Sequence, residues 1–196
     1  MKTKDKIREV AFDIFSTEGF SGTSIRQIAK TVGIRESAIY NHFNSKEDII
    51  SEIIMEYKIR IESRNLLTDQ LLEKLSNPKD FLYSYVMELI KIWDTEEEKK
   101  MLRLLLIEQF RNKSNQDLTL SDLIDREKSV WLIIFQEMMK LKVIKDYNRD
   151  RLSDEFLFPL FLIRIEYISK NKKTDIQFVK KLCKFHIEYF WNSIKR

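Results

Sequence analysis

A short stretch near the N-terminus, TVGIRESAIYNHF at residues 31–43, combines a glycine with several polar and aromatic side chains. Residues 20–46 around it hold four basic residues and one acidic residue, a net charge of +3 in a chain whose formal total is +4. Guanidinium, amide and hydroxyl groups on a basic surface are the groups that contact phosphates and base edges. The stretch is therefore compatible with a surface that contacts nucleic acid.

Three helices are predicted to position these groups within the first 45 residues. The first has an apolar stripe at i, i+3, i+4 spacing, formed by Ile7, Val10, Ala11, Ile14 and Phe15. The second begins at Ser24, which forms a capping-box pattern with Gln27, and ends at Gly33. The third is predicted over residues 35–42.

Two short helices joined by a tight glycine turn are what a helix-turn-helix unit requires. The second of them must be short, because its N-terminal residues have to reach base edges in a major groove about 12 Å wide. Arg26 has the strongest physical case for reading a base, since a bidentate contact from arginine to guanine is worth ~1–3 kcal/mol.

The stretch from residue 19 to residue 50 resembles the DNA-binding domain of the TetR-type transcriptional repressors. The matching positions are Gly19, Phe20, Thr23, Ser24, Ile28, Ala29, Gly33, Ile34, Tyr40, His42, Phe43, Ser45, Lys46 and Glu47. The resemblance implies a homodimer that binds a pseudo-palindromic double-stranded DNA operator. It also implies a ligand-responsive repressor that a small-molecule effector in the C-terminal domain releases from DNA.

Carried over position by position, the resemblance implies a set of DNA-contacting residues. Phosphate contacts are implied for Tyr40, His42 and Lys46. Contacts to bases or to the groove wall are implied for Arg26, Glu36, Ser37, Ala38 and Asn41. Ser24, Gln27 and Arg35 complete the predicted DNA-binding set.

Two positions depart from the family pattern. Arg35 stands where Ser or Thr is usual, so the third helix lacks a capping oxygen at a cost of ~1 kcal/mol. Glu36 partly compensates by placing negative charge in the first turn, and Arg35 has the length to reach a phosphate. Ala38 replaces a polar reader, so it can touch a thymine methyl group but can form no hydrogen bond.

The rest of the chain is predicted to be helical, because no glycine follows residue 33. The capping pattern of Ser45 and Asp48 starts a helix of about 20 residues, and Pro78 starts another. Four more are expected at 96–111, 121–142, 153–170 and 174–195. We therefore expect an all-α chain, with a helix-turn-helix DNA-binding domain at 1–46 and a ligand-binding and dimerisation domain at 47–196.

The last two predicted helices are apolar on more than one side, which indicates a homodimer through these helices. Pro159 lies inside the first of them and is expected to kink it, because proline cannot donate to the carbonyl of Glu155.

A surplus of methionine and aromatic side chains on inward faces suits an adaptable apolar effector site. The candidates are Tyr85, Trp93, Phe110, Trp131, Phe135, Met138, Met139, Phe158 and Phe161, although core packing alone would explain each of them. Buried charges at Glu108 or Arg164 would strengthen the case for such a site, but both residues are expected to form salt bridges at the surface. Cys183 and His186 are expected to pack at the dimer interface.

Several function classes find no support in the sequence. No apolar run approaches a membrane span, and the N-terminus lacks the apolar core of a secretory signal, so we expect a cytoplasmic protein. One cysteine and two histidines make a metal centre improbable, and no cofactor loop or catalytic motif is present. The alternatives are an all-helical enzyme or carrier, and an architectural or division-control protein of the same fold that binds DNA without an inducer.

Overall fold

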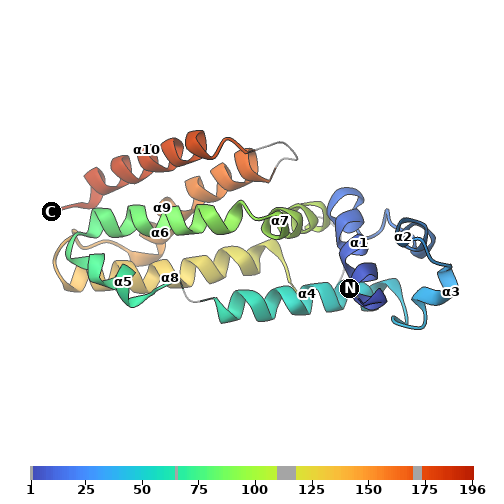
Figure 1. Cartoon of the computed structure of the whole chain (residues 1–196). Coiled ribbons are helices and arrows are strands. Elements are labelled where there is room, and N and C mark those ends of the chain that lie inside the picture. Colours follow the sequence, from blue (N-terminus) through green and yellow to red (C-terminus); the bar gives the residue numbers. More distant parts are fainter. Residues whose placement is uncertain (1, 65, 110–117, 170–173) are drawn as a thin grey trace. The chain divides into compact units, whose positions relative to one another are not determined.

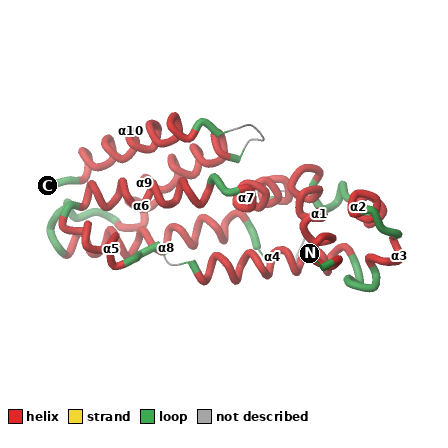
Figure 2. Tube along the Cα trace, in the orientation of Figure 1, coloured by secondary structure: helices red, strands yellow, loops and turns green. Residues whose placement is uncertain are grey.

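The computed structural model describes residues 2–64, 66–109, 118–169 and 174–196. Helices connected by short loops make up this part of the chain, and none of it forms a strand (Figures 1 and 2). The α-helices are α1 (Thr3–Glu18), α2 (Ile25–Val32), α3 (Glu36–Ile39), α4 (Lys46–Ser63), α5 (Asp69–Leu72), α6 (Pro78–Trp93), α7 (Glu96–Glu108), α8 (Leu120–Lys140), α9 (Arg149–Ile163) and α10 (Ile176–Ile194). A 3-10 helix, η1 (Glu73–Ser76), follows α5, and a π-helical turn, η2 (Arg164–Ile168), follows α9. The prediction of an all-α chain is confirmed.

The chain divides into two compact units. Unit 1 contains residues 1–64 and 100–120, and unit 2 contains residues 65–99 and 121–196. The helix α7 is divided between the units after Lys99. These units describe packing, and the functional boundary between residues 46 and 47 stays a prediction.

In unit 1, α1 packs against α2 and α4, and α2 packs against α3. The predicted stripe of α1 faces this small core, with Ile7, Ala11 and Phe15 fully buried. Ile39 and Phe43 are also buried, as their i, i+4 spacing predicts. The three N-terminal helices therefore bury their apolar faces in one shared core and leave the polar faces of α2 and α3 in solvent.

In unit 2, buried side chains of α6, α8, α9 and α10 form one core. Asn77 and Pro78 start α6 as predicted. The start of α9 was predicted too late, because Asn148 caps it by accepting a hydrogen bond from the amide of Arg151 at 3.0 Å. The sequence did not indicate this start, because an asparagine in a polar loop can be identified as a helix cap only when the amide that it binds is known.

The α9 helix continues through Pro159 to Ile163 and then widens into the π-helical turn η2. The amide of Ser169 donates to the carbonyl of Arg164 at 3.1 Å, five residues back, as a π turn requires. The widened turn begins at Arg164, so the backbone changes its winding where this charged side chain enters the core.

Candidate nucleic-acid interface

The boundaries of α2 follow from its two terminal residues. The hydroxyl of Ser24 accepts a hydrogen bond from the amide of Gln27 at 3.1 Å, which confirms the predicted cap. Gly33 has φ +83° and ψ +33°, and its amide donates to the carbonyls of Ala29 and Lys30. Glycine adopts this left-handed conformation without a steric cost, so the chain turns directly into α3.

The α3 helix is shorter than predicted. Its four residues, Glu36–Ile39, form one turn, and Arg35 provides no side-chain cap at the N-terminus, as its side-chain type predicts. The difference lies at the C-terminal end, where residues 40–42 form turns and the amides of His42 and Phe43 donate to the carbonyl of Ile39.

The predicted DNA-contacting side chains lie mainly in solvent. Arg26 is 86% exposed and Tyr40 is 55% exposed, although tyrosine is usually at least partly buried. The other exposed members are Ser24, Arg35, Glu36, Ser37, Asn41 and His42, while Gln27, Ala38 and Lys46 are half-buried. Because α2 and α3 pack on each other, these side chains share one end of unit 1.

Acidic groups lie beside two of the predicted readers. The Nε of Arg26 is 3.9 Å from a carboxylate oxygen of Glu36, and the side-chain amide of Gln27 donates to Glu18 at 2.8 Å. The exposed ion pair of Arg26 with Glu36 contributes little to stability, so DNA can replace it at a small cost. The Gln27 side chain therefore does not complete the capping box.

Lys46 has intramolecular partners in this structure. Its Nζ donates to the carbonyl of Phe20 at 2.7 Å and to the carbonyl of Thr23 at 2.6 Å, and it lies 4.3 Å from the centre of the Phe20 ring. The lysine therefore joins the first residue of α4 to the segment between α1 and α2. Its predicted phosphate contact stays a prediction.

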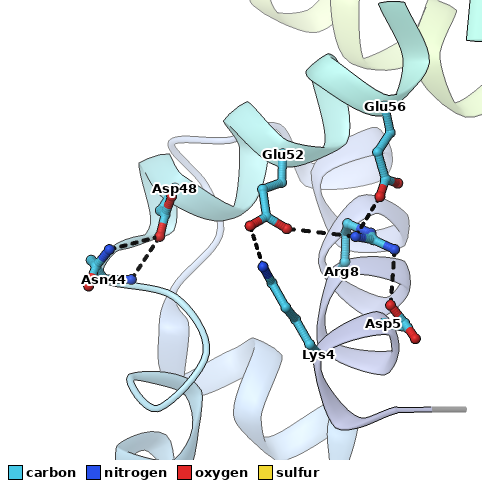
Figure 3. A network of polar contacts seen from close by, with 7 residues as sticks. All are labelled: Lys4, Asp5, Arg8, Asn44, Asp48, Glu52 and Glu56. Carbon is cyan, nitrogen blue, oxygen red and sulfur yellow. Dashed lines mark hydrogen bonds and ion pairs between the residues drawn. The ribbon is translucent and has the colours of Figure 1, made fainter. Parts of the chain in front are cut away.

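A polar network joins α1 to α4 (Figure 3). Arg8 on α1 pairs with Glu56 at 2.6 Å and with Glu52 at 3.6 Å on α4, and Lys4 also pairs with Glu52. Arg8 therefore has two acidic partners on successive turns of α4.

Among the predicted effector residues, Tyr85, Trp131 and Phe135 lie in one aromatic cluster of unit 2. The Trp131 ring lies 4.7 Å from Tyr85 and 4.4 Å from Phe156, both edge to face, and 5.5 Å from Phe135. Phe156 was absent from the prediction. Burial and the nearby carboxylate of Glu127 raise the pKa of Tyr85 above its ordinary value, against an opposing effect of Arg126. The indole Nε1 of Trp131 has no hydrogen-bond acceptor among the described residues.

Trp93 and Phe161 lie around a second group in unit 2, the guanidinium of Arg164. It is 5.2 Å from the Trp93 ring and 5.6 Å from the Phe161 ring, and it pairs with Glu98 at 2.8 Å. The expectation that Arg164 and Glu108 lie at the surface is wrong, because the two residues are 3% and 4% exposed. Periodicity could not show this, since their partners lie 66 and 88 residues away.

The remaining effector candidates are dispersed. Met138 is buried and Met139 is partly buried against the core, whereas Phe158 is 50% exposed on α9. Phe110 lies outside the described residues.

An open groove of about 530 Å³ lies beside α5, η1 and α6. None of the predicted effector residues lines it, and its lining is Gln70, Glu73, Lys74, Ser76, Asn77, Asp80, Tyr83 and Ser84. The effector site therefore stays a prediction.

Cys183 and His186 both pack inside unit 2. Burial raises the pKa of the Cys183 thiol to about 12. Burial lowers the pKa of His186, against the opposing effect of its 2.9 Å hydrogen bond to the Phe156 carbonyl. A neutral, shielded thiol is a poor nucleophile and a poor metal ligand, so both residues are best explained by packing.

Comparisons with known proteins agree with this arrangement. Residues 7–53 match the family described as bacterial regulatory proteins, tetR family. The negative transcriptional regulator IcaR of the biofilm operon icaADBC, from Staphylococcus aureus strain Newman, is 34% identical over 94 residues. That match covers 48% of each chain, so this chain spans about half the length of the curated relatives it matches.

Similarity to solved structures extends over nearly the whole chain. A transcriptional regulator from Aquifex aeolicus VF5 is 25% identical, with 96% of this chain and 99% of that chain covered at a TM-score of 0.62. A regulator from Saccharomonospora viridis, solved in complex with choline, is 19% identical, with 98% of each chain covered at a TM-score of 0.63. The latter match concerns the fold alone. No helix in the described part of this chain is long and apolar enough to cross a membrane.

Proposed function

We propose that this chain is a transcriptional repressor, because residues 7–53 match the tetR family of bacterial regulatory proteins and their geometry suits DNA binding. The single observation that carries the proposal is the exposure of Arg26 and Tyr40 beside the short helix α3, on a core formed by α1 and α2. An exposed recognition helix with a basic neighbour is the arrangement that a major groove accepts. Such a protein acts in the bacterial cytoplasm, where its operator is.

The partner is a pseudo-palindromic duplex that two copies of the chain bind together. Support for a homodimer comes from the apolar side chains that α9 and α10 leave in solvent. They are Phe158, Leu162, Phe178, Phe185 and Tyr189. Two α3 helices of such a dimer read half-sites one helical turn apart, at ~34–36 Å.

Release from DNA is proposed to follow binding of a small, largely apolar effector in unit 2. The aromatic cluster around Trp131 supports this, because its indole N–H can donate to an acceptor on a ligand. The rings of this cluster contact one another, so an effector there has to displace a side chain. To regulate, it must also bind the released state more tightly than the DNA-bound state.

Operator binding by the purified protein tests the proposal. A duplex is selected from a random library with the wild-type protein, and its affinity for Arg26→Ala and Tyr40→Ala is measured by fluorescence anisotropy. Loss of a base contact by Arg26→Ala costs ~1–3 kcal/mol, whereas Arg149→Ala, an exposed arginine of unit 2, is the control that keeps wild-type affinity. Unchanged affinity and sequence preference in both interface variants would refute the interface.

A second function is an architectural or division-control protein that binds DNA without an effector. The contacts of the Trp131 ring with Tyr85 and Phe156 favour it, because an effector at this cluster would have to displace a side chain. Thermal-shift screening of small apolar compounds distinguishes the two functions. The effector-controlled repressor is supported by a compound that raises the melting temperature of the wild type more than that of Trp131→Phe. The same compound must also weaken operator binding.

A further inference from the structure

The segment between α1 and α2, residues 19–24, is held at the backbone of one residue, Phe20, from two sides. The amide of Phe20 donates to the carboxylate of Glu108 at 2.9 Å in a buried hydrogen bond. The carbonyl of Phe20 accepts from Lys46 at 2.7 Å. Glu108 is the last residue of α7 and Lys46 is the first residue of α4, so two further helices restrain this segment.

The segment has little freedom to absorb a displacement. A Cβ atom on Gly22 would lie 2.6 Å from the backbone oxygen of Glu18. The hydroxyl of Thr23 donates to the carbonyl of Gly19 at 2.8 Å. Close backbone approach and local hydrogen bonds thus make the segment compact up to Ser24, the cap of α2.

We infer that Glu108 is a positioning residue for the DNA-reading end of the protein, with Lys46 as its counterpart. Glu108 itself is buried and contacts no base. It fixes the Phe20 amide, and through residues 20–24 it fixes where the first turn of α2 places Arg26 and Gln27. Side chains that read base edges must be held within about 0.5 Å of the productive geometry, so this indirect restraint contributes to sequence preference. The inference rests on the proposed DNA-binding function.

Charge and hydrogen bonding at Glu108 are separable. Glu108→Gln keeps an oxygen that accepts from the Phe20 amide, whereas Glu108→Leu keeps a similar volume and leaves that amide without the carboxylate. The matched control is Glu96→Leu, because Glu96 lies on the same helix with a side chain 73% exposed.

The first measurement compares specific with non-specific binding, on an operator duplex selected by the wild type and on a scrambled duplex. Both are used at one salt concentration and well below the melting temperature of each variant. For Glu108→Leu we expect operator affinity to fall about tenfold or more, while affinity for the scrambled duplex, which depends on phosphate contacts, stays within about twofold. Glu108→Gln and Glu96→Leu should stay within about threefold of the wild type for both duplexes. Equal losses on both duplexes, or wild-type specificity in Glu108→Leu, would overturn the inference.

The second measurement needs no DNA, so it separates failure of this inference from failure of the proposed function. Hydrogen exchange of the Phe20 amide is followed by NMR in the three variants. Exchange of this amide should become about tenfold faster in Glu108→Leu and stay near the wild-type rate in Glu108→Gln and Glu96→Leu. Unchanged exchange in Glu108→Leu would show that Glu108 does not hold the segment, whether or not the protein binds an operator.

Discussion

The guanidinium of Arg164 donates to the carboxylate of Glu98 at 2.8 Å, and both side chains are 4% exposed. The pair joins the start of the π-helical turn η2 to the first turn of α7, beside the rings of Trp93 and Phe161. A buried ion pair adds little stability over an apolar pair, but removal of one partner costs more because the other charge stays buried.

Single substitutions of this pair are therefore expected to be more harmful than the double substitution. Arg164→Met or Glu98→Leu alone should lower the free energy of unfolding by ~3–5 kcal/mol, and the two together by clearly less than their sum. Urea unfolding followed by circular dichroism measures the three values. The exposed pair Lys91 and Glu88, at 2.6 Å, is the control, and its loss should cost less than about 1 kcal/mol. Additive effects at Arg164 and Glu98 would argue against the pairing.

The two glycines that flank α2 should respond differently to alanine. Gly33→Ala meets no atom within 4 Å, so only its positive φ disfavours alanine, at ~1–2 kcal/mol. Gly22→Ala has to move the backbone of Glu18, so it should lower the unfolding free energy by more. Equilibrium unfolding of both variants gives the order, and a greater loss in Gly33→Ala would contradict the proposed tight approach.

A serine at position 35 should stabilise the protein and weaken its binding to DNA. Arg35 precedes α3 without a side-chain cap, so Arg35→Ser supplies the missing oxygen and should add ~0.5–1 kcal/mol to the free energy of unfolding. If Arg35 contacts a phosphate, the same variant also lowers the slope of log affinity against log salt concentration by about 0.9. Arg35→Ala, which adds no cap, controls for loss of the charge alone.

Disruption of the apolar surface of α10 should dissociate the proposed homodimer. Tyr189 is 80% exposed, and a charge placed there would have to be buried in a dimer. Tyr189→Glu is therefore expected to sediment as a monomer and to bind the operator weakly. Ile133→Glu is the matched control, because Ile133 is also exposed but lies on α8. Dimers of Tyr189→Glu at wild-type affinity would place the interface elsewhere.

Stability should fall in mild acid through His186. Burial lowers its pKa below the ordinary 6.5, so below pH 6.5 the unfolded chain binds a proton that the folded chain does not. Its contribution is complete above pH 6.5 and is lost as the pH falls through the pKa of the folded state. The urea midpoint is measured between about pH 7.5 and about pH 5.5, and it should fall less for His186→Gln than for the wild type. The effect of the carboxylates is the same in both proteins, so it does not affect the comparison.

Local signals were sufficient for the long helices and for several of their caps. Ser24, Gly33 and Ser45 act through hydrogen bonds to residues within four positions, so residue type and spacing predicted these caps. The same local rules missed α5 and η1, where the apolar pattern is too short to be periodic.

By itself, the sequence determined the helical class, the glycine turn before α3 and the residue types that α2 and α3 offer to solvent. These depend on backbone preferences and on apolar spacing, which act over a few residues. Only the tertiary structure decided that Glu108 and Arg164 are buried, that Glu108 and Lys46 bind the amide and the carbonyl of Phe20, and that Trp131 packs among Tyr85 and Phe156. Their partners are distant in sequence, and long side chains with a charge at the end are placed by whichever distant group the folded chain brings within reach.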